Sequence, residues 1–343
     1  NLIINGAMQV AQRGTSYSGN SHSHKTVDRW TSAPGGDSTT QVQSQHALTS
    51  SDTGPWEKGF RHSFHVTKGA ESADAADYLQ LRTLIEDQDV AQSGWNYTSS
   101  SSKITLSFWA KASVAQTYYV MLRTRGDESS GNIRQHSFAF ALAANTWTKV
   151  TKTISGDANI AFDNDNTRGL AVYLIPYYGT DWTTSGHTND AWEAYNGGDQ
   201  LPDMTSTWWT TNNSTFEFTG VQLEVGSVAT DFEHRSYGDE LARCERYYQV
   251  KGGFTGLCAS GSVVYLAGSI NPTMRATPTV SGTAALMVND NGVNATQSSL
   301  SVAQTDVTKE GFFINADNFS SLTSNRPALM RPAGGEMTFA AEL

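Results

Sequence analysis

Short blocks of alternating apolar and polar residues recur along the chain and are separated by turn residues. In the clearest block, residues 104–110, every second residue is apolar and shares one face, whereas Trp109 belongs to the opposite face. Because successive side chains of a β-strand point to opposite faces of the sheet, this period of two predicts half-buried strands. The same pattern predicts further strands over residues 117–125, 136–143, 148–154, 216–225, 263–267, 285–288, 312–315 and 337–340.

Two blocks depart from simple alternation. Residues 170–175 form a continuous apolar run, which is typical of a central strand that is covered on both faces. Within residues 216–225 the apolar residues shift from even to odd positions across Gly220. One extra residue in a strand switches the phase in this way, so we predict a β-bulge at Gly220.

One helix is predicted, over residues 236–248. Ser236 and Asp239 have the spacing of a capping box, in which the two side chains satisfy amides that the first helical turn leaves unpaired. A narrow apolar stripe runs along one side of this segment, so we expect the helix to pack against another surface. The pattern divides the chain into a large β domain (1–235), a connecting helix (236–250) and a second β domain (251–343).

The composition favours strands over helices. The 343-residue chain contains 37 Ser, 39 Thr and 30 Gly, whereas only 16% of its residues are charged. Surface helices rely on Glu, Lys, Arg and Ala, while Thr favours strands and Ser and Gly favour turns. We therefore expect an all-β protein.

The charge and the cysteine count exclude several classes of partner. Lys and Arg number 23 and Asp and Glu 33, which gives a net charge of −10 at pH 7. Nucleic-acid affinity rests on clustered cations, so nucleic acid is not an expected partner. No run approaches the roughly 18 apolar residues of a membrane helix, so no membrane insertion is expected. For Cys244 and Cys258 we expect two free thiols, with a single bridge between them as the alternative.

Several segments resemble modules of bacteriophage appendage proteins. Residues 1–14 (NLIINGAMQVAQRG) and 27–30 (VDRW) resemble the start of jelly-roll modules in phage tail fibres. Residues 218–248 resemble the last strand of such a module and the helix that leads into a C-terminal domain. Residues 107–112 (SFWAKA) and 147–150 (WTKV) are similar to the carbohydrate-binding jelly rolls of secreted glycoside hydrolases.

The resemblance implies an antiparallel jelly-roll β-sandwich, a short connecting helix and a second, smaller β-sandwich domain. It also implies an extracellular location on the virion and a homotrimer that contacts other virion proteins. The function expected from it is that of a non-enzymatic fibre or receptor-binding protein, which attaches the phage to glycans of the host surface. The chain begins at Asn1 rather than Met, so we expect an upstream segment.

A long segment between residues 175 and 215 lacks periodicity and is rich in aromatic and acidic residues. Loops of this length in compact domains are usually functional or disordered. Sugar rings bind through flat C–H faces and hydroxyl rims, so a lectin-like site needs an aromatic platform beside carboxylate acceptors. The alternative is that the aromatic side chains fold inward as a local core of the loop. The candidate glycan-binding residues are Tyr177, Tyr178, Asp181, Trp182, Asp190, Trp192, Tyr195, Trp208 and Trp209.

Two short patterns carry potential metal ligands. Asp163 and Asp165 place carboxylates at alternating positions, as the start of a calcium loop does, but the glycine and the closing glutamate of an EF-hand are missing. The alternatives are a structural calcium ion at Asp163 and Asp165 or a plain Asx-rich turn. His22 and His24 form a His-x-His pattern, for which we expect a solvated loop rather than an axial metal site of a threefold fibre. No other cofactor is predicted.

No catalytic motif was found, since G-x-S-x-G, P-loop, H-E-x-x-H and G-x-G-x-x-G patterns are absent from the sequence, and we predict no enzymatic activity. Two alternatives stay open. The jelly roll is a structural scaffold of a head or tail fibre if the loop aromatics contact a neighbouring subunit or their own core. It is a glycan-cleaving module if two carboxylates face each other across a groove. Receptor contact through C-terminal loops at residues 289–294 or 318–325 competes with the aromatic loop.

Overall fold

The computed structural model describes residues 1–343 except 37–38, 126–131, 283–286, 291–292, 298–301 and 331–335. The chain divides into two compact units, one of Asn1–Glu240 with Leu343 and one of Leu241–Glu342. The division falls within helix α3 (Tyr237–Glu245). Strands dominate both units, which confirms the predicted all-β class.

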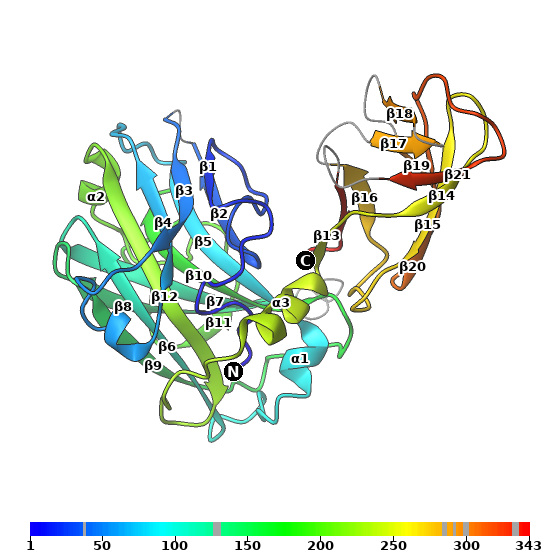
Figure 1. The fold of residues 1–343 in the computed structure, drawn as a ribbon. Helices are drawn as coiled ribbons and strands as arrows, with labels where there is room; N and C mark the ends of the chain where they lie inside the picture. The colour runs from blue at the N-terminus through cyan, green and yellow to red at the C-terminus, as the bar shows by residue number, and fades with distance from the viewer. Residues whose placement is uncertain (37–38, 126–131, 283–286, 291–292, 298–301, 331–335) are drawn as a thin grey trace. The chain divides into compact units, whose positions relative to one another are not determined.

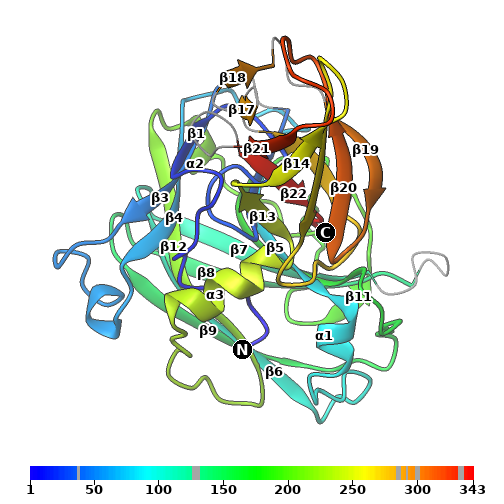
Figure 2. The same ribbon diagram turned by 45° about the vertical axis from the view of Figure 1, so that its right-hand side comes forward.

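The N-terminal unit is a sandwich of two six-stranded antiparallel sheets (Figures 1 and 2). The first sheet has the order β1 (Ser16–Ser18), β3 (Val42–Ala47), β4 (His62–Lys68), β12 (Ser214–Val225), β6 (Lys103–Ala112) and β9 (Thr148–Ser155). The second sheet has the order β11 (Trp192–Ala194), β8 (Arg134–Leu142), β7 (Gln116–Thr124), β10 (Arg168–Tyr178), β5 (Tyr78–Glu86) and β2 (Trp30–Gly35). The short helices of this unit are η1 (Trp56–Lys58), α1 (Asp87–Ala91) and α2 (Thr207–Thr210). This architecture is the expected jelly-roll β-sandwich.

The core of the N-terminal unit lies between the two sheets. Strand β6 shows how the sequence builds it, because its even-numbered residues from Ile104 to Ala110 are all 0% exposed, as the alternation predicted. Removing such side chains from water contributes about 25 cal/mol per Å² of apolar surface. Trp109 lies on the opposite face of β6 and is only partly buried.

Strand β10 is covered on both faces, as its continuous apolar run predicted. Leu170, Val172 and Leu174 belong to the core between the sheets. Tyr173 and Ile175 belong to a second apolar cluster on the outer face of the same sheet. All five side chains are 0% exposed.

The predicted bulge is present in β12. The register against β6 shifts between Thr219 and Gln222, and Gly220 has a φ of +63°. A Cβ atom at Gly220 would lie 2.6 Å from the ring of Phe60, so only glycine fits here. The bulge lets apolar residues on both sides of it reach the core, since Phe216, Phe218, Val221 and Leu223 are all 0% exposed.

The N-terminal segments that resemble phage modules have a structural role. The Asn5 side chain donates hydrogen bonds to the backbone carbonyls of Val10 and Asp28, both at 2.9 Å, and accepts one from the Val10 amide. The Trp30 indole donates to the Asn5 carbonyl. These bonds hold the start of the chain against the turn that leads into β2.

Helix α3 begins with the predicted cap and ends earlier than predicted. The Ser236 hydroxyl accepts a hydrogen bond from the Asp239 amide and donates one to the Asp239 carboxylate. The helix ends at Glu245, and Tyr248 opens strand β13, because the backbone there pairs with β22 instead of continuing the helix. Cys244 and Cys258 are both buried and are not joined by a disulfide bond, as expected.

The C-terminal unit contains a three-stranded and a seven-stranded antiparallel sheet (Figure 2). The smaller sheet has the order β13 (Tyr248–Lys251), β22 (Met337–Ala340) and β16 (Thr279–Gly282). The larger sheet has the order β18 (Val293–Thr296), β17 (Met287–Asp290), β21 (Pro327–Met330), β14 (Thr255–Cys258), β15 (Val264–Ser269), β20 (Gly311–Ala316) and β19 (Val302–Val307). Of the strand predicted at 285–288, residues 285–286 lie outside the described residues. This unit is the predicted second β-sandwich.

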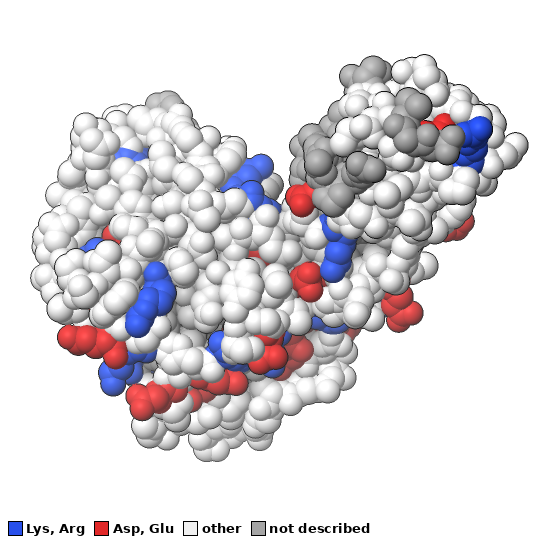
Figure 3. Space-filling view, viewed as in Figure 1, with Lys and Arg blue, Asp and Glu red and all other residues white. Residues whose placement is uncertain are grey.

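The surface is poor in charge. Figure 3 shows that Lys, Arg, Asp and Glu are scattered over this face and that most of its atoms belong to uncharged residues. Among the described residues, no helix has the length and apolar character needed to cross a membrane.

Candidate functional site

The predicted aromatic loop covers the outer face of the second sheet. Strands β5, β7 and β10 present an apolar surface there. Leu201 of the loop is 0% exposed on this surface, and Trp182 and Met204 pack against it while partly buried. The loop therefore closes a face that would otherwise expose several large apolar side chains to water.

Four of the nine glycan-binding candidates are buried. Tyr177 (5% exposed) and Tyr178 (3%) belong to β10, and Trp208 and Trp209 (both 0%) belong to α2. The Trp209 indole donates to the Asp77 carboxylate at 3.1 Å, and its ring stacks on Tyr177 with 5.0 Å between centroids. Rings buried in this way offer no open face to a sugar in this structure, and glycan contact by these four residues stays a prediction.

The other five candidates are partly or fully exposed, but most of them already have partners. Each indole N–H donates to a backbone carbonyl, at 3.0 Å for Trp182 and 2.7 Å for Trp192. The guanidinium of an arginine lies 4.7 Å over the ring of Tyr195, and Asp190 forms an ion pair of 2.6 Å. Asp181 is exposed. Glycan binding by these five residues stays a prediction.

A serine, a histidine and an aspartate meet where the loop joins strand β8. Ser137 Oγ lies 2.6 Å from His187 Nε2, and His187 Nδ1 lies 2.9 Å from Asp199 Oδ1. The same hydroxyl donates to Asn189 Oδ1 at 2.8 Å. Ser137 is 1% exposed and the His187 side chain is 1% exposed, so a substrate carbonyl cannot reach this hydroxyl. The three residues fasten the loop to the sheet.

Side chains of the two predicted metal patterns make other contacts in the structure. Asp165 accepts hydrogen bonds at 2.7 Å from both the amide and the hydroxyl of Thr167, which is an Asx turn. His22 Nε2 lies 2.5 Å from the Pro34 carbonyl oxygen. Within the described ranges, one group of His, Cys, Asp or Glu side chains brings three possible ligand atoms within 4.8 Å of one another, and it includes neither Asp163 nor His22.

A cavity of about 540 Å³ lies on the outer face of the first sheet. We call it the first-sheet cavity. Strand β6, the bulge of β12 and strand β9 form its floor, and the loops at residues 57–60 and 230–234 form its walls. Aromatic, acidic, basic and hydroxyl side chains all take part: the lining residues are Glu57, Lys58, Gly59, Phe60, Ser107, Trp109, Lys149, Gly220, Thr230, Asp231, Phe232 and His234.

Trp109 stands on the floor of this cavity and is held by the loop that precedes η1. Gly54 has a φ of +97°, and a Cβ atom there would lie 2.6 Å from the Trp109 ring, so glycine lets the loop approach the indole. In the same loop, Asp52 accepts hydrogen bonds from the Trp147 indole at 3.0 Å and from Lys111 Nζ at 3.2 Å. Burial raises the pKa of the Asp52 carboxyl, but these bonds and a backbone amide outweigh burial and hold its pKa at about 2. Asp52 is therefore ionised at neutral pH and anchors the loop.

The second wall of the cavity is built by the most specific of the phage-like segments. The Glu224 carboxylate accepts hydrogen bonds from the Thr230 amide at 2.9 Å and hydroxyl at 2.7 Å. Burial raises the pKa of Glu224, but these bonds outweigh it and lower the pKa below its usual value. Gln222 accepts a hydrogen bond from the Glu233 amide. This network fixes the turn that presents Asp231 and Phe232 to the cavity.

Sequence reasoning placed Trp109 on the outer face of its strand but did not identify a site there. Trp56, Trp109, Trp147 and Phe232 are all partly buried and pack around a small core of Ala7, Leu48 and Phe60. These residues come from segments far apart in the chain. One available signal was the large aromatic residue at the outward phase of β6.

The fold and this site define a two-domain all-β protein with a ligand-sized cavity on the outer face of its jelly roll. No protein-family model matches the sequence, and no curated protein matches it. Solved structures do match, among them a phage tailspike domain and carbohydrate-binding modules.

The enzymatically active domain of tailspike protein 4 of bacteriophage CBA120 is 12% identical, with a TM-score of 0.31, over 66% of this chain and 21% of that chain. The match thus spans 21% of the tailspike's length. The family 11 carbohydrate-binding module of the Clostridium thermocellum cellulase Lic26A-Cel5E is 12% identical, with a TM-score of 0.32, over 64% of this chain and 98% of the module. A CBM4 structure is 12% identical, with a TM-score of 0.31, over 66% of this chain and 100% of that chain. At such identities the alignments do not identify binding residues in this chain.

Proposed function

We propose that this chain is a non-enzymatic receptor-binding protein of a phage appendage and that its first-sheet cavity binds glycans of the host surface. The observation that carries the proposal is the partly exposed indole of Trp109 on the cavity floor, beside Phe232 on the wall. Aromatic faces of this kind stack on the C–H faces of sugar rings. The phage-like segments at residues 1–14, 27–30 and 218–248 support the assignment to an appendage.

The polar lining suits a carbohydrate ligand. Glu57 and Asp231 offer carboxylate acceptors, Lys149 offers a donor, and Ser107 offers a hydroxyl. Sugars present donors and acceptors in nearly equal number, so both kinds of group are needed around the aromatic floor. The volume of about 540 Å³ lies in the roughly 300–1,000 Å³ range of ligand pockets.

We further propose a homotrimer on the virion, outside the cell. The outer face of the seven-stranded sheet in the C-terminal unit supports self-association, because four large apolar side chains are exposed on it. Tyr265 and Phe313 lie 5.5 Å apart between ring centroids, and Leu257 is the cross-strand neighbour of Tyr265. Exposed apolar groups that cluster in this way mark protein contacts. The four residues are Leu257 (42% exposed), Tyr265 (38%), Phe313 (39%) and Leu329 (42%). Three weak sites per trimer would then act together on a glycan-coated surface.

The test is a glycan-array screen of the purified protein, combined with its mass by light scattering. We expect selective binding, loss of binding in Trp109→Ala, and a mass three times that of the 37.1 kDa chain. Trp182→Ala changes a partly buried tryptophan of the aromatic loop and tests the competing loop prediction; under the present proposal it should bind as the unmodified protein does. A trimer that binds no glycan would contradict the proposal and favour the scaffold function.

A glycan-cleaving function is the second candidate, because two carboxylates, Glu57 and Asp231, line the same cavity. Glycosidases use such a pair as acid and base or nucleophile. Incubation of the protein with each glycan that it binds, followed by a reducing-end assay, separates the two functions. We expect no new reducing ends. Release of sugar that stops in both Glu57→Gln and Asp231→Asn would establish the enzyme instead.

A further inference from the structure

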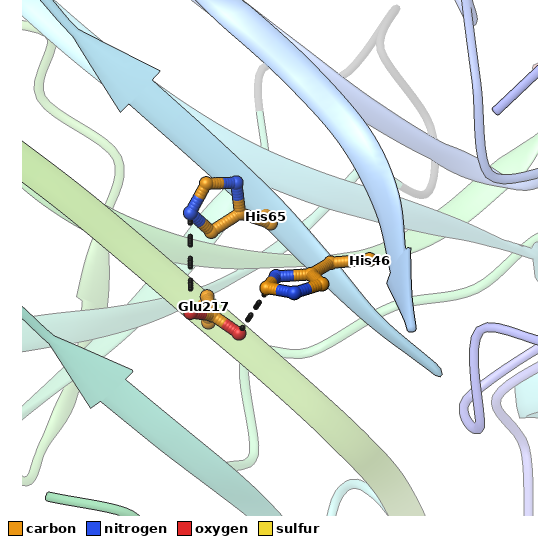
Figure 4. A group of neighbouring side chains, drawn as sticks. All are labelled: His46, His65 and Glu217. Carbon is orange, nitrogen blue, oxygen red and sulfur yellow. Dashed lines mark ion pairs between the residues drawn. The ribbon is translucent and has the colours of Figure 1, made fainter. Parts of the chain in front are cut away.

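Two histidines and a glutamate meet on the outer face of the first sheet, outside the first-sheet cavity. His46 lies on β3, His65 on β4 and Glu217 on β12, which are neighbouring strands (Figure 4). His65 and Glu217 stand directly opposite each other in the register of β4 and β12. Their side chains thus share one face of a rigid sheet, which holds them in place.

The distances between these side chains suit a small cation. His46 Nδ1 lies 3.6 Å from Glu217 Oε2, and His65 Nε2 lies 3.9 Å from Glu217 Oε1. All three possible ligand atoms lie within 4.8 Å of one another. Ligands at about 2.0–2.2 Å from a tetrahedral ion are separated by distances of this order, so only small side-chain movements are required.

The surroundings leave this group accessible and orient its carboxylate. The Glu217 side chain is 5% exposed, that of His65 is 17% exposed and that of His46 is 47% exposed, so an ion can enter beside His46. The Ser63 hydroxyl donates to Glu217 Oε2 at 3.1 Å and orients the carboxylate. Lys111 Nζ lies 3.2 Å from Glu217 Oε1. The same ammonium group lies 3.2 Å from Asp52 Oδ1.

We propose that His46, His65 and Glu217 bind one divalent transition-metal ion of the Zn²⁺ class. Two imidazoles and one carboxylate are a donor set that Zn²⁺ prefers, whereas Ca²⁺ and Mg²⁺ require oxygen ligands. Three protein ligands leave a fourth position for water or for an external donor. The ion links three strands of the first sheet.

The proposed metal site is adjacent to Trp109 along the sheet. In the register of β12 and β6, Glu217 stands opposite Lys111, and Thr219 stands opposite Trp109, two residues further along each strand. The positive charge of Lys111 competes with a cation for Glu217, so the affinity for Zn²⁺ depends on this lysine as well as on the three ligands.

The test is calorimetric titration of the metal-stripped full chain with ZnCl₂, and with CaCl₂ as the comparison. We expect one Zn²⁺ per chain, no binding of Ca²⁺ at this site, and a visible absorption band when Co²⁺ replaces Zn²⁺. His46→Ala and Glu217→Gln should each weaken Zn²⁺ binding by at least about tenfold. Lys111→Met should strengthen it.

The matched control is the double variant His22→Ala/His24→Ala, which removes the His-x-His pair in the loop between β1 and β2 and should leave Zn²⁺ affinity unchanged. His46 is largely exposed, so His46→Ala is expected to keep the fold, and its Tm without metal verifies this. Zn²⁺ should raise the Tm of the unmodified protein but not of His46→Ala. No saturable Zn²⁺ binding by the unmodified protein, or unchanged affinity in His46→Ala/His65→Ala, would overturn the proposal.

Discussion

The two outer faces of the jelly roll differ in what covers them. The outer face of the second sheet lies under the chain's own loop, which places Leu201, Trp182 and Met204 on it. The outer face of the first sheet carries the first-sheet cavity and the group formed by His46, His65 and Glu217. One sandwich thus has a closed face and an open face.

The difference follows from the residues of the central strands whose side chains point to the outer face of each sheet. In β10 these residues are Ala171, Tyr173 and Ile175, and in β12 they include Glu217 and Thr219. An apolar outward phase is stable only when another layer excludes water from it. A polar outward phase needs no continuous apolar layer. Glu217 and Thr219 are themselves 4% and 0% exposed, but the first-sheet cavity leaves room for a ligand beside Trp109. The aromatic residues that bind are therefore expected on the face with the polar strands.

The largest predicted effect concerns the two classes of tryptophan. Trp209→Ala removes a fully buried ring, its stacking on Tyr177 and its hydrogen bond to Asp77. We expect the free energy of unfolding to fall by about 3–5 kcal/mol. Trp109→Ala removes a partly exposed ring and should cost far less. Urea unfolding of both variants measures this, and equal losses would contradict the division into a closed and an open face.

A pH effect is expected from the inner face of the second sheet, where His136 shares the phase of the core residues Phe138 and Phe140 on β8. Burial lowers the pKa of His136 from its ordinary value of 6.5 to about 4 in the folded protein, while Asp190 raises this pKa and Lys152 lowers it to a lesser degree. Below pH 6.5 the unfolded chain takes up a proton that the folded chain excludes, so stability falls from pH 6.5 to pH 4 by about 3 kcal/mol.

Urea unfolding between pH 7 and pH 4 tests this expectation, and His136→Phe provides the comparison. The substitution preserves a ring beside Trp192, whose centroid lies 5.3 Å from that of His136. We expect the loss of stability with falling pH to be smaller in the variant. If the free energy of unfolding changed with pH identically in the two proteins, His136 would not titrate in this range.

The third prediction is that replacing Ser137 loosens the aromatic loop. Ser137→Ala removes the hydroxyl that contacts His187 and Asn189, which should cost about 1–2 kcal/mol because buried polar partners are left unsatisfied. Hydrogen exchange in residues 179–206 should accelerate more than in the first sheet. Ser185→Ala, at an exposed position of the same loop, should change neither quantity. Uniform acceleration across both sheets would argue against a local fastening role.

The smallest predicted effect is on the open face. Asp52→Asn keeps the shape of the side chain but removes the charge that pairs with Lys111, and we expect a loss of about 1 kcal/mol or less at pH 7. The loop with Gly54 should become less ordered around Trp109, so ligand affinity should fall more than stability. The same titration and unfolding experiments measure both, and unchanged affinity would remove Asp52 from the account of the site.

Local patterns in the sequence predicted much of the fold. The alternation in residues 104–110, the apolar run at 170–175 and the phase shift at Gly220 each reflect contacts between a strand and its two faces. Such contacts are encoded by neighbouring residues, so the pattern could be interpreted without the structure.

The site could not be predicted in the same way. The first-sheet cavity combines β6 with loops near residues 57–60 and 230–234, and their proximity depends on the order of strands in the sheet. The aromatic residues of 177–209 do not locate a site by themselves, because tyrosine and tryptophan serve equally in cores and in binding sites. The density of these residues does not show whether their rings face the core or the solvent. For Trp208 and Trp209, hydrogen bonds to groups inside the fold show that the rings face the core.

The central claim is that ligands bind on the open face and not on the aromatic loop. Its most direct test is calorimetric titration of the glycan selected by the array into Trp109→Ala and Trp182→Ala. We expect binding to be lost in Trp109→Ala and unchanged in Trp182→Ala, with both variants folded by circular dichroism. Binding that survives in Trp109→Ala and disappears in Trp182→Ala would contradict the claim and return the site to the loop.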